Sequence, residues 1–414
     1  WHKKLYSYYE VQCESFLCKG CVRPCTRIFM KNNILKSYLI VSLFAVSASA
    51  QSIVPTPPEL NLTSYILMDA TTGKILAESN SNSQIEPASM TKVMTGYIVA
   101  DQIEQGMISN DDNVLISRKA WKMEGSRMFI EVGKRVSVKD LLKGLVIQSG
   151  NDAAVALAEY VAGSEQIFVD VMNEYASVLG LRNTLFQNST GLPDVDHFTS
   201  VRDLAVLSRA LIDEFPSHYD LYKEKEFTFN NIRQLNRNKL LWRDESVDGM
   251  KTGHTEAAGY CLIASAKRND MRLVTVVAGS KSDKERFDAS QRLLEYGFRF
   301  YAAQKLLEGN KELKSSTVWG GKKESVSIGL ENDLLVTLPR GDFRNLTINY
   351  TIQNNIQAPI KAGDELGLVE VISNNNIVVS ESLIALEDID EKGFFGRMIA
   401  KIILWFIGLF NFNE

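Results

Sequence analysis

The chain has 414 residues, of which 45% are hydrophobic and 23% are charged, and its formal net charge is −4. Residues 1–50 hold seven basic and two acidic side chains, so the remaining 364 residues carry a formal charge of −9. This acidic balance argues against nucleic acid as a partner, and 364 residues exceed one ordinary hydrophobic core, which predicts two domains.

Residues 30–50 have the form of a secretory signal peptide. Lys31 and Lys36 supply a charged region, an apolar stretch follows, and the sequence "ASA" ends the segment as a cleavage site. The mature protein is therefore expected to begin at Gln51. We interpret residues 1–29 as upstream sequence translated from a misplaced start.

Four of the five cysteines lie in that upstream segment, at Cys13, Cys18, Cys21 and Cys25. Their spacing could suggest a zinc or iron–sulfur site, but such a site would not mature ahead of an export signal. We therefore predict no metal and no cofactor. The remaining Cys261 stands in the apolar run "GYCLIASA", which predicts a buried core residue rather than a reactive thiol.

The first elements expected along the mature chain are a hairpin and several helices. Residues 64–79 alternate in strand fashion around a T-T-G-K turn. Helical patterns then dominate from Ser89 to about Leu307. They are clearest at 137–147, 152–161, 166–179 and 200–215. The last of these begins at Ser200, which we expect to form a capping box with Asp203.

Two strand-like runs at 259–266 and 271–279 are joined by the turn "KRND" and followed by a helix from about Lys284. Because strands come from both ends of the segment 51–311, we predict a mixed α/β domain there. Short β-rich pieces between Gly, Asn and Pro turns, among them "TVWGG", "LLVTLP" and "NLTINYTI", predict a small all-β domain over 312–390.

The tail 391–414 contains the sequence "KGFFGRMIAKIILWFIGLFNFNE". Arg397 and Lys401 lie four positions apart on one face of a helix whose other faces are apolar and aromatic. Its longest uninterrupted apolar run, Ile402 to Phe410, has nine residues, against the ~20 needed to span a bilayer. We predict an amphipathic helix that lies on a membrane surface; a core helix packed on the β domain is the alternative.

Three short motifs could carry chemistry. Ser89 and Lys92 form the only S-x-x-K, and on one helical turn such residues face the same way. Further motifs are Ser149-Gly150-Asn151, and Lys251-Thr252-Gly253-His254 before a strand. Each motif alone is weak evidence, but their occurrence together in this order is specific.

In these motifs the sequence resembles the penicillin-recognising serine enzymes. More closely it resembles the low-molecular-mass penicillin-binding proteins of the five and six type, which are D-alanyl-D-alanine carboxypeptidases. The likeness covers almost all of residues 51–414, including "SGNDAAVALAEYVAGS", "NSTGLPDVDHFTS", "VDGMKTGHTEAAGYC" and "FFGR". It implies a β-lactamase/transpeptidase-like α/β domain, a C-terminal all-β domain and an amphipathic C-terminal helix.

A serine hydroxyl is a weak nucleophile that needs a neighbouring base, and a buried amine beside another cation can have a pKa low enough to serve. We expect Lys92 to be the base for Ser89, with Lys251 as the neighbouring cation. Ser149 would relay a proton between Lys92 and the leaving amine, and Asn151 would hold the amide carbonyl of the substrate.

The resemblance also implies how the substrate binds. The backbone N–H groups of Ser89 and His254 would form an oxyanion hole. Lys251, Thr252 and Gly253 of the K-T-G motif would bind the terminal carboxylate of the substrate. Arg237 of "NRN" would bind the same carboxylate, although a plain surface arginine is the competing interpretation.

Two further stretches lie near the site by resemblance. Asp194, Asp196 and His197 could suggest a metal, but a polar loop leading into the next helix is the expected interpretation. Residues 117–129 are expected to form a loop bordering the cleft, where basic side chains attract an anionic peptide or are simply solvated.

The leading hypothesis is a periplasmic enzyme, held on the inner membrane by its tail, that removes the terminal D-Ala from peptidoglycan pentapeptides through an acyl-enzyme and so influences cell shape. β-lactams would acylate the same serine. A serine β-lactamase shares the motifs, but its class A members typically have Asp where Gly150 stands here. The motifs are also compatible with a D,D-endopeptidase, and a non-catalytic peptidoglycan-binding shape protein is the competing hypothesis outside the enzymes.

Overall fold

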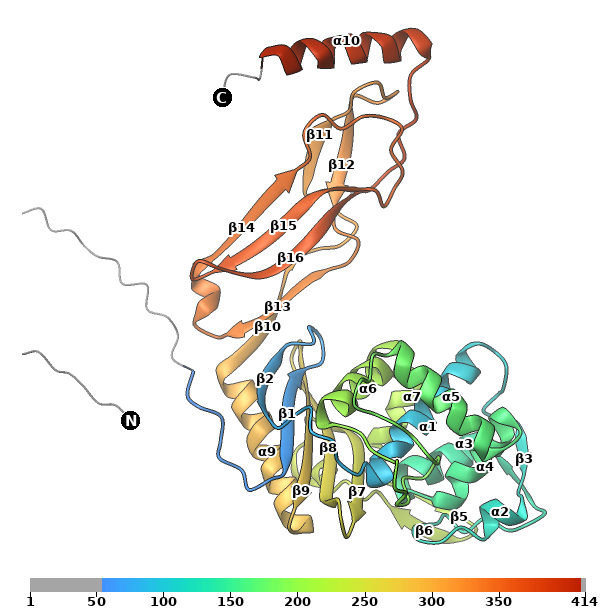
Figure 1. Cartoon of the computed structure of the whole chain (residues 1–414). Coiled ribbons are helices and arrows are strands. Elements are labelled where there is room, and N and C mark those ends of the chain that lie inside the picture. The colour runs from blue at the N-terminus through green and yellow to red at the C-terminus, as the bar shows by residue number, and fades with distance from the viewer. Residues whose placement is uncertain (1–53, 411–414) are drawn as a thin grey trace, which may run out of the picture. The chain divides into compact units, whose positions relative to one another are not determined.

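The computed structural model describes residues 54–410 (Figure 1). The predicted signal peptide, its cleavage site and the four N-terminal cysteines lie outside the described residues. The features that position the site are a five-stranded sheet and the helices on its two faces.

The sheet is antiparallel, in the order β2-β1-β9-β8-β7. Its strands are β1 (Ser64–Asp69), β2 (Ile75–Ser79), β7 (Val247–Thr255), β8 (Gly259–Arg268) and β9 (Met271–Ser280). β1 pairs with β2, which confirms the predicted hairpin. The pair β8–β9 is also confirmed, with longer strands than expected and only Asn269 and Asp270 left in the turn. The strand β1 from the start of the domain thus lies beside β9 from its end.

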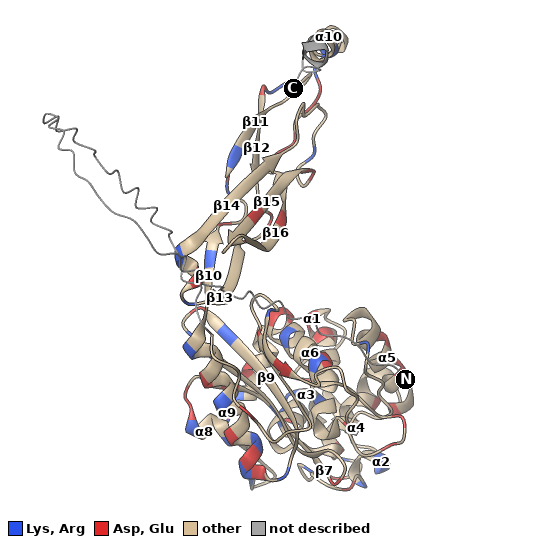
Figure 2. Ribbon diagram, turned by 60° about the vertical axis from the view of Figure 1, so that its left-hand side comes forward, with Lys and Arg blue, Asp and Glu red and all other residues tan. Residues whose placement is uncertain are grey.

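One face of the sheet is covered by a single long helix, α9 (Asp283–Phe300). The Ser282 side chain caps it by accepting a hydrogen bond from the N–H of Glu285. Phe287 and Leu293 are fully buried against sheet residues such as Leu262. Acidic and basic residues are interspersed along the helix (Figure 2). An amphipathic pattern therefore explains this layer.

The other face carries a cluster of helices (Figure 1). The longer ones are α1 (Lys92–Glu104), α4 (Asn151–Ala162), α5 (Glu165–Val178) and α6 (Val201–Glu214). The short elements on this face are the 3-10 turns Ala88–Thr91 and Asp220–Lys223, α2 (Arg118–Trp121), α3 (Val138–Lys143), α7 (Pro216–Tyr219), β3 (Asn113–Leu115), β4 (Arg135–Ser137), β5 (Glu226–Phe229) and β6 (Ile232–Leu235). The short helix α8 (Leu240–Arg243) packs instead on the side of α9. Residues 92–100 of α1 are all buried, as expected of a helix that is surrounded by others.

The C-terminal part of the chain forms a second, all-β core. Its sheet has the order β11-β12-β16-β15-β14, and a separate pair joins β10 to β13. These strands are β10 (Tyr301–Leu307), β11 (Lys314–Thr317), β12 (Ser325–Gly329), β13 (Leu334–Pro339), β14 (Leu346–Ile352), β15 (Glu365–Ser373) and β16 (Asn376–Ala385), with a 3-10 turn at Asp342–Asn345. Val326, Val369 and Leu383 are fully buried in this core. The chain thus has the predicted α/β fold and all-β fold.

Helix α10 (Phe394–Phe410) follows the all-β core. Phe394, Phe395, Ile399 and Trp405 are 55–73% exposed, which is unusual for large apolar side chains. The alternative of a helix buried in the β core does not fit this exposure.

Two details of the helical region differ from the sequence expectations. The helix expected over 137–147 ends as α3 at Lys143 and continues as a π-helical turn, Gly144–Gln148. Ser200 caps α6 as predicted, but Asp203 does not close a capping box. Its carboxylate accepts hydrogen bonds from Asn183 N and Thr184 Oγ1 instead.

Two strand boundaries also differ. Residues 301–307 form β10, although helical patterns were expected to continue to about Leu307. These residues form a strand because they pair with β13, and the local sequence pattern does not indicate so distant a partner. Of the piece "TVWGG" only Thr317 lies in a strand.

Candidate active site

Ser89 lies in the 3-10 turn that leads directly into α1, so Lys92 opens the helix one turn later. Lys92 Nζ is 3.1 Å from Ser89 Oγ. It also lies 2.7 Å from Asn151 Oδ1 and 2.5 Å from the carbonyl oxygen of Thr190. The Lys92 side chain is 1% exposed. The oxygens of Asn151 and Thr190 therefore hold this buried amine beside the serine hydroxyl.

Ser149 ends the π-helical turn in a left-handed backbone conformation, with φ 64°. Non-glycine residues rarely adopt this conformation, and π-turns and strained residues are both frequent at functional sites. The Ser149 side chain contacts Lys251, whose Nζ lies 2.8 Å from Ser149 Oγ. A second serine–lysine pair thus stands next to the first.

β7 supplies the K-T-G-H motif along the edge of the sheet. Lys251 and Thr252 are buried, while His254 is exposed and packs on its cross-strand partner Tyr260 with ring centroids 4.1 Å apart. A Cβ on Gly253 would lie 3.2 Å from the Cβ of Ala88. Glycine therefore lets β7 approach the turn that carries Ser89.

Burial dominates the electrostatics of both lysines. Burial and the positive charge of Arg237 lower the pKa of Lys92 to about 7, against the opposing effect of Asp152. The pKa of Lys251 is lowered well below its usual value, first by burial and then by the charge of Lys92. The two lysine amines thus disfavour each other's positive charge, and Arg237 acts on both as a further cation.

Arg237 reaches the site because its two neighbours are fixed. Asn236 and Asn238 are buried, and their side-chain amides donate to the carbonyl oxygens of Glu224 and Gly249. The exposed Arg237 between them donates from Nε to the carbonyl oxygen of Gln148 at 2.9 Å. The interpretation as a plain surface arginine does not explain this contact beside Ser149.

Asp152 is a structural residue of the site that sequence reasoning missed. Its buried carboxylate accepts hydrogen bonds from the N–H groups of Met128, Phe129 and Ile130 at 2.9–3.3 Å. The same loop, residues 124–130, supplies the Glu124 carbonyl oxygen that accepts from Asn151 Nδ2 at 2.6 Å. An acidic residue in the first turn of a helix suggests only a dipole interaction, so its sequence position did not reveal this role.

His197 was expected to be part of a polar loop, and the structure shows that it is buried with defined hydrogen-bond partners. It is 3% exposed, and its Nδ1 accepts from Gln187 N at 2.8 Å. A neutral ring therefore carries its proton on Nε2, which lies 2.8 Å from Thr91 Oγ1. Asp194 and Asp196 are exposed. His197 thus ties the loop 188–197 to the turn that carries Ser89.

The described residues also include the remaining candidates for metal and thiol chemistry. Within residues 54–410, no group of three or more His, Cys, Asp or Glu side chains is placed to hold a metal ion. Cys261 is fully buried as predicted, and burial raises the pKa of its thiol to about 11.

A serine beside a buried lysine of low pKa, a second serine–lysine pair and an adjoining edge strand define the class of penicillin-recognising serine enzymes. The family model described as D-alanyl-D-alanine carboxypeptidase matches residues 51–282, and that of the penicillin-binding protein 5 C-terminal domain matches residues 301–391. The chain belongs to the D-alanyl-D-alanine carboxypeptidase family.

Individual relatives agree with this assignment. The chain is 43% identical over 381 residues to the D-alanyl-D-alanine carboxypeptidase DacC of Escherichia coli, covering 89% of this chain and 95% of the relative. It is 40% identical to DacA of Haemophilus influenzae, covering 91% and 98%. The crystal structure of penicillin binding protein 5 from Haemophilus influenzae superposes with a TM-score of 0.78 at 41% identity, covering 81% of this chain and all of that one.

Proposed function

We propose that this protein is a serine D-alanyl-D-alanine carboxypeptidase that removes the terminal D-Ala from peptidoglycan pentapeptides. The observation that carries the proposal is the contact of 3.1 Å between Ser89 Oγ and the buried Lys92 amine, whose pKa is about 7. A base with a pKa near the working pH is well matched to proton transfer. Neutral Lys92 accepts the Ser89 proton as the hydroxyl attacks the penultimate carbonyl.

The remaining site residues act on the substrate. Backbone N–H groups of Ser89 and His254 stabilise the oxyanion, and Asn151 holds the amide carbonyl on the acyl side. Ser149 returns the proton to the departing amine. The terminal carboxylate binds to Thr252, Lys251 and Arg237, while Gly253 keeps β7 close to Ser89. Water then hydrolyses the acyl-enzyme, and β-lactams acylate the same serine.

A β-lactamase activity is less well supported. A Cβ on Gly150 would lie 2.8 Å from Asp152 Oδ1, and 3.3 Å from both Gly144 O and Met128 N. The Asp that class A β-lactamases typically carry at this position would crowd the Asp152 carboxylate here. The complete set of contacts at Ser89 and Lys92 also favours an enzyme over a non-catalytic shape protein.

The decisive experiment measures free D-Ala released from a soluble peptide ending in D-Ala-D-Ala, together with penicillin acylation followed by intact mass. We expect release and a single acyl adduct, both of which vanish in Ser89→Ala. Acylation without release would point to another substrate. The absence of acylation in the unchanged protein would reject Ser89 as the nucleophile.

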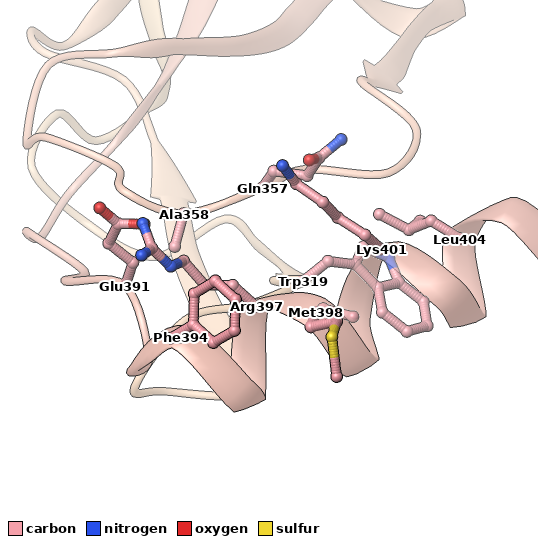
Figure 3. A pocket seen from close by; sticks show the side chains of 11 residues that line it. Trp319, Gln357, Ala358, Glu391, Phe394, Arg397, Met398, Lys401 and Leu404 are labelled. Atoms are coloured by element: carbon pink, nitrogen blue, oxygen red, sulfur yellow. The ribbon is translucent and has the colours of Figure 1, made fainter.

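We further propose that α10 holds the enzyme on the inner membrane, on its periplasmic side. Arg397 points toward Glu391, its partner at 2.6 Å, and Lys401 points toward Gln357 (Figure 3). The basic side chains therefore face the all-β core, while Phe395 and Ile399 are exposed. None of the described helices is long and apolar enough to cross a membrane. A surface anchor formed by residues 391–414 fits these features.

The limits of the signal peptide and of the two domains are also proposals, and they come from the sequence. We propose export by a signal peptide at 30–50, followed by a catalytic domain and an all-β domain, for which the sequence predicts 51–311 and 312–390. Because β10 (Tyr301–Leu307) pairs with β13 of the all-β core, we move the proposed boundary between the two domains to about residue 300. N-terminal sequencing of the protein recovered from the periplasm tests the first of these, with Gln51 as the expected first residue.

A further inference from the structure

The buried Arg286, in the first turn of α9, contacts the strand that carries the K-T-G-H motif. Its Nη1 donates a hydrogen bond to the carbonyl oxygen of Gly253 at 3.0 Å and to that of Cys261 at 3.3 Å. The side chain is 7% exposed, so these hydrogen bonds lie in the interior. The Gly253 oxygen belongs to the same peptide bond as the N–H of His254. Arg286 therefore holds one end of a peptide whose other end is the donor assigned to the oxyanion hole.

The two hydrogen bonds fix the direction of this peptide. Gly253 and Cys261 are cross-strand partners in β7 and β8. A single nitrogen reaches both carbonyl oxygens only when both lie in the gap between the two strands, so the Gly253 oxygen points toward β8. In a trans peptide the C=O and N–H groups point in opposite directions. The N–H of His254 therefore points away from β8.

The N–H of His254 leaves the sheet at a free edge. β7 is the last strand in the sheet order and has no partner there besides β8 among the described residues. β7 contacts the turn Ala88–Thr91, and a Cβ on Gly253 would lie 3.2 Å from the Cβ of Ala88, the residue before Ser89. The orientation that Arg286 fixes is thus the one that an oxyanion hole beside Ser89 requires.

The charge of Arg286 acts on the same peptide. A guanidinium remains protonated at any pH at which the protein is folded. A cation that is hydrogen-bonded to a carbonyl oxygen polarises the peptide, which makes the N–H at its other end a stronger donor. Because Arg286 is buried, water does not screen this effect strongly.

Three contacts hold the guanidinium in this position. Arg286 forms an ion pair with Asp283, three positions earlier on α9. Its guanidinium carbon lies 4.9 Å from the ring centroid of Phe287 and 5.4 Å from that of Tyr260. Tyr260 in turn packs on the ring of His254. The guanidinium is thus fixed by both the helix and the strand.

We propose that Arg286 is a positioning residue for the reaction, which orients the N–H of His254 in the oxyanion hole and strengthens it as a donor. The proposal rests on the proposed function, in which this N–H stabilises the oxyanion. The negative charge on the substrate oxygen develops fully only as Ser89 attacks. The contribution of Arg286 should therefore be seen in kcat and not in substrate binding.

The experiment measures kcat and KM for D-Ala release from a soluble peptide ending in D-Ala-D-Ala, with the full mature chain. The variants are Arg286→Gln, which removes the cation, and Arg286→Lys, which keeps one. The matched control is Arg292→Gln, because Arg292 is an exposed residue of the same helix. Infrared difference spectra of the penicillin-acylated proteins give the stretching frequency of the ester carbonyl on Ser89, which falls as its hydrogen bonds strengthen.

We expect Arg286→Gln to lose about tenfold in kcat, with KM within about twofold of normal. This loss is smaller than the hundredfold or more that follows removal of an oxyanion-hole donor, because the N–H itself remains. The ester carbonyl of Arg286→Gln should absorb at a higher frequency than that of the unchanged protein. Arg286→Lys should recover most of the lost kcat, and Arg292→Gln should change neither kcat nor the frequency.

A normal kcat in Arg286→Gln, an equal loss in Arg286→Lys, or a change confined to KM would overturn the inference while leaving the carboxypeptidase in place. If Arg286→Gln does not fold, the spectrum of the unchanged protein decides. An ester carbonyl that absorbs there as it does in water would show that the N–H of His254 does not reach it. Failure of the unchanged protein to release D-Ala would instead reject the proposed function.

Discussion

At the scale of single residues, the site depends on an ionisable side chain that the fold buries. Lys92 is an amine with almost no exposure, and the neighbouring cation Arg237 disfavours its protonated form. Its catalytic competence is therefore a property of its surroundings, and changing those surroundings should move its titration.

Acylation should increase with pH through the pKa of Lys92. The neutral amine is the base, so the β-lactam acylation rate should rise from pH 5.5, reach half its plateau near pH 7 and level off above pH 8. Arg237→Gln removes a cation that lowers this pKa, so its midpoint should shift to higher pH. Stopped-flow acylation with a fluorescent penicillin measures both profiles. A pH-independent rate would contradict Lys92 as the base.

His197 should make the fold sensitive to acid. Burial lowers its pKa to about 4, against 6.5 for an exposed histidine. Between these values the unfolded chain binds a proton that the folded protein does not, so the free energy of unfolding should fall as the pH drops from 6.5 to 4. The loss is of the order of 3 kcal/mol. Urea unfolding at pH 7 and 4.5 should show a smaller difference for His197→Gln. An unchanged difference would reject this origin.

Asp152→Asn should destabilise the loop that holds Asn151. The amide keeps one accepting oxygen, so two of the backbone N–H groups now bound to the carboxylate lose their acceptor. We expect a loss of about 3 kcal/mol in the free energy of unfolding and slower acylation. Thermal melting and penicillin acylation test this. The exposed Asp170→Asn should stay within about 0.5 kcal/mol of the unchanged protein.

At the scale of elements, sequence patterns predicted the features that depend on residues close together in the chain. The hairpin at 64–79, the capping serine of α6 and the pair β8–β9 follow from local periodicity and turn residues. β10 was missed because its partner β13 begins about thirty residues later. The π-turn was missed because Leu145, Val146 and Ile147 are equally compatible with an α-helix.

In the candidate site, too, local motifs predicted some residues, and residues with distant contacts were missed. The motifs identified both lysines and both serines, which the structure brings together. The residues that hold the site in place could not be predicted from the sequence. Asp152 contacts a loop more than twenty residues earlier, and His197 contacts Thr91, which lies 106 positions earlier. Such contacts depend on packing, which no short pattern encodes.

The turn that carries Ser89 should be sensitive to its packing against Gly191. A Cβ there would lie 1.7 Å from the Ala88 carbonyl oxygen, whereas Gly163, with a similar φ of 79° against 81°, has nothing within 4 Å. Gly163→Ala should cost only the strain of a positive φ, about 1 kcal/mol. Gly191→Ala should cost clearly more and slow acylation at least tenfold. Equal melting temperatures and rates for the two variants would contradict this packing.

At the scale of the whole molecule, catalysis and attachment use different parts of the chain. Every group assigned to the reaction lies between Ser89 and Arg286, whereas the exposed apolar helix α10 begins at Phe394. The two functions should therefore separate when the chain is shortened.

A chain ending at Glu391 should release D-Ala from a soluble peptide at the rate of the full mature protein, because it keeps the catalytic groups and both cores. It should no longer sediment with phospholipid vesicles, since the apolar face of α10 is gone. Vesicle sedimentation and D-Ala release measure the two properties. A shortened chain that still sediments would show that another surface binds the membrane.

The π-turn at Gly144–Gln148 should limit which insertions and deletions this protein can acquire in evolution. Each residue of an α-helix turns by about 100°, so removal or addition of one residue there would rotate the following Ser149 and Asn151 away from their lysines. Side chains within the turn can be exchanged for others of similar size, but its length cannot vary. Insertions should be tolerated instead at the exposed tip of a turn such as Asn269–Asp270, where added residues can extend into solvent while β8 and β9 keep their pairing.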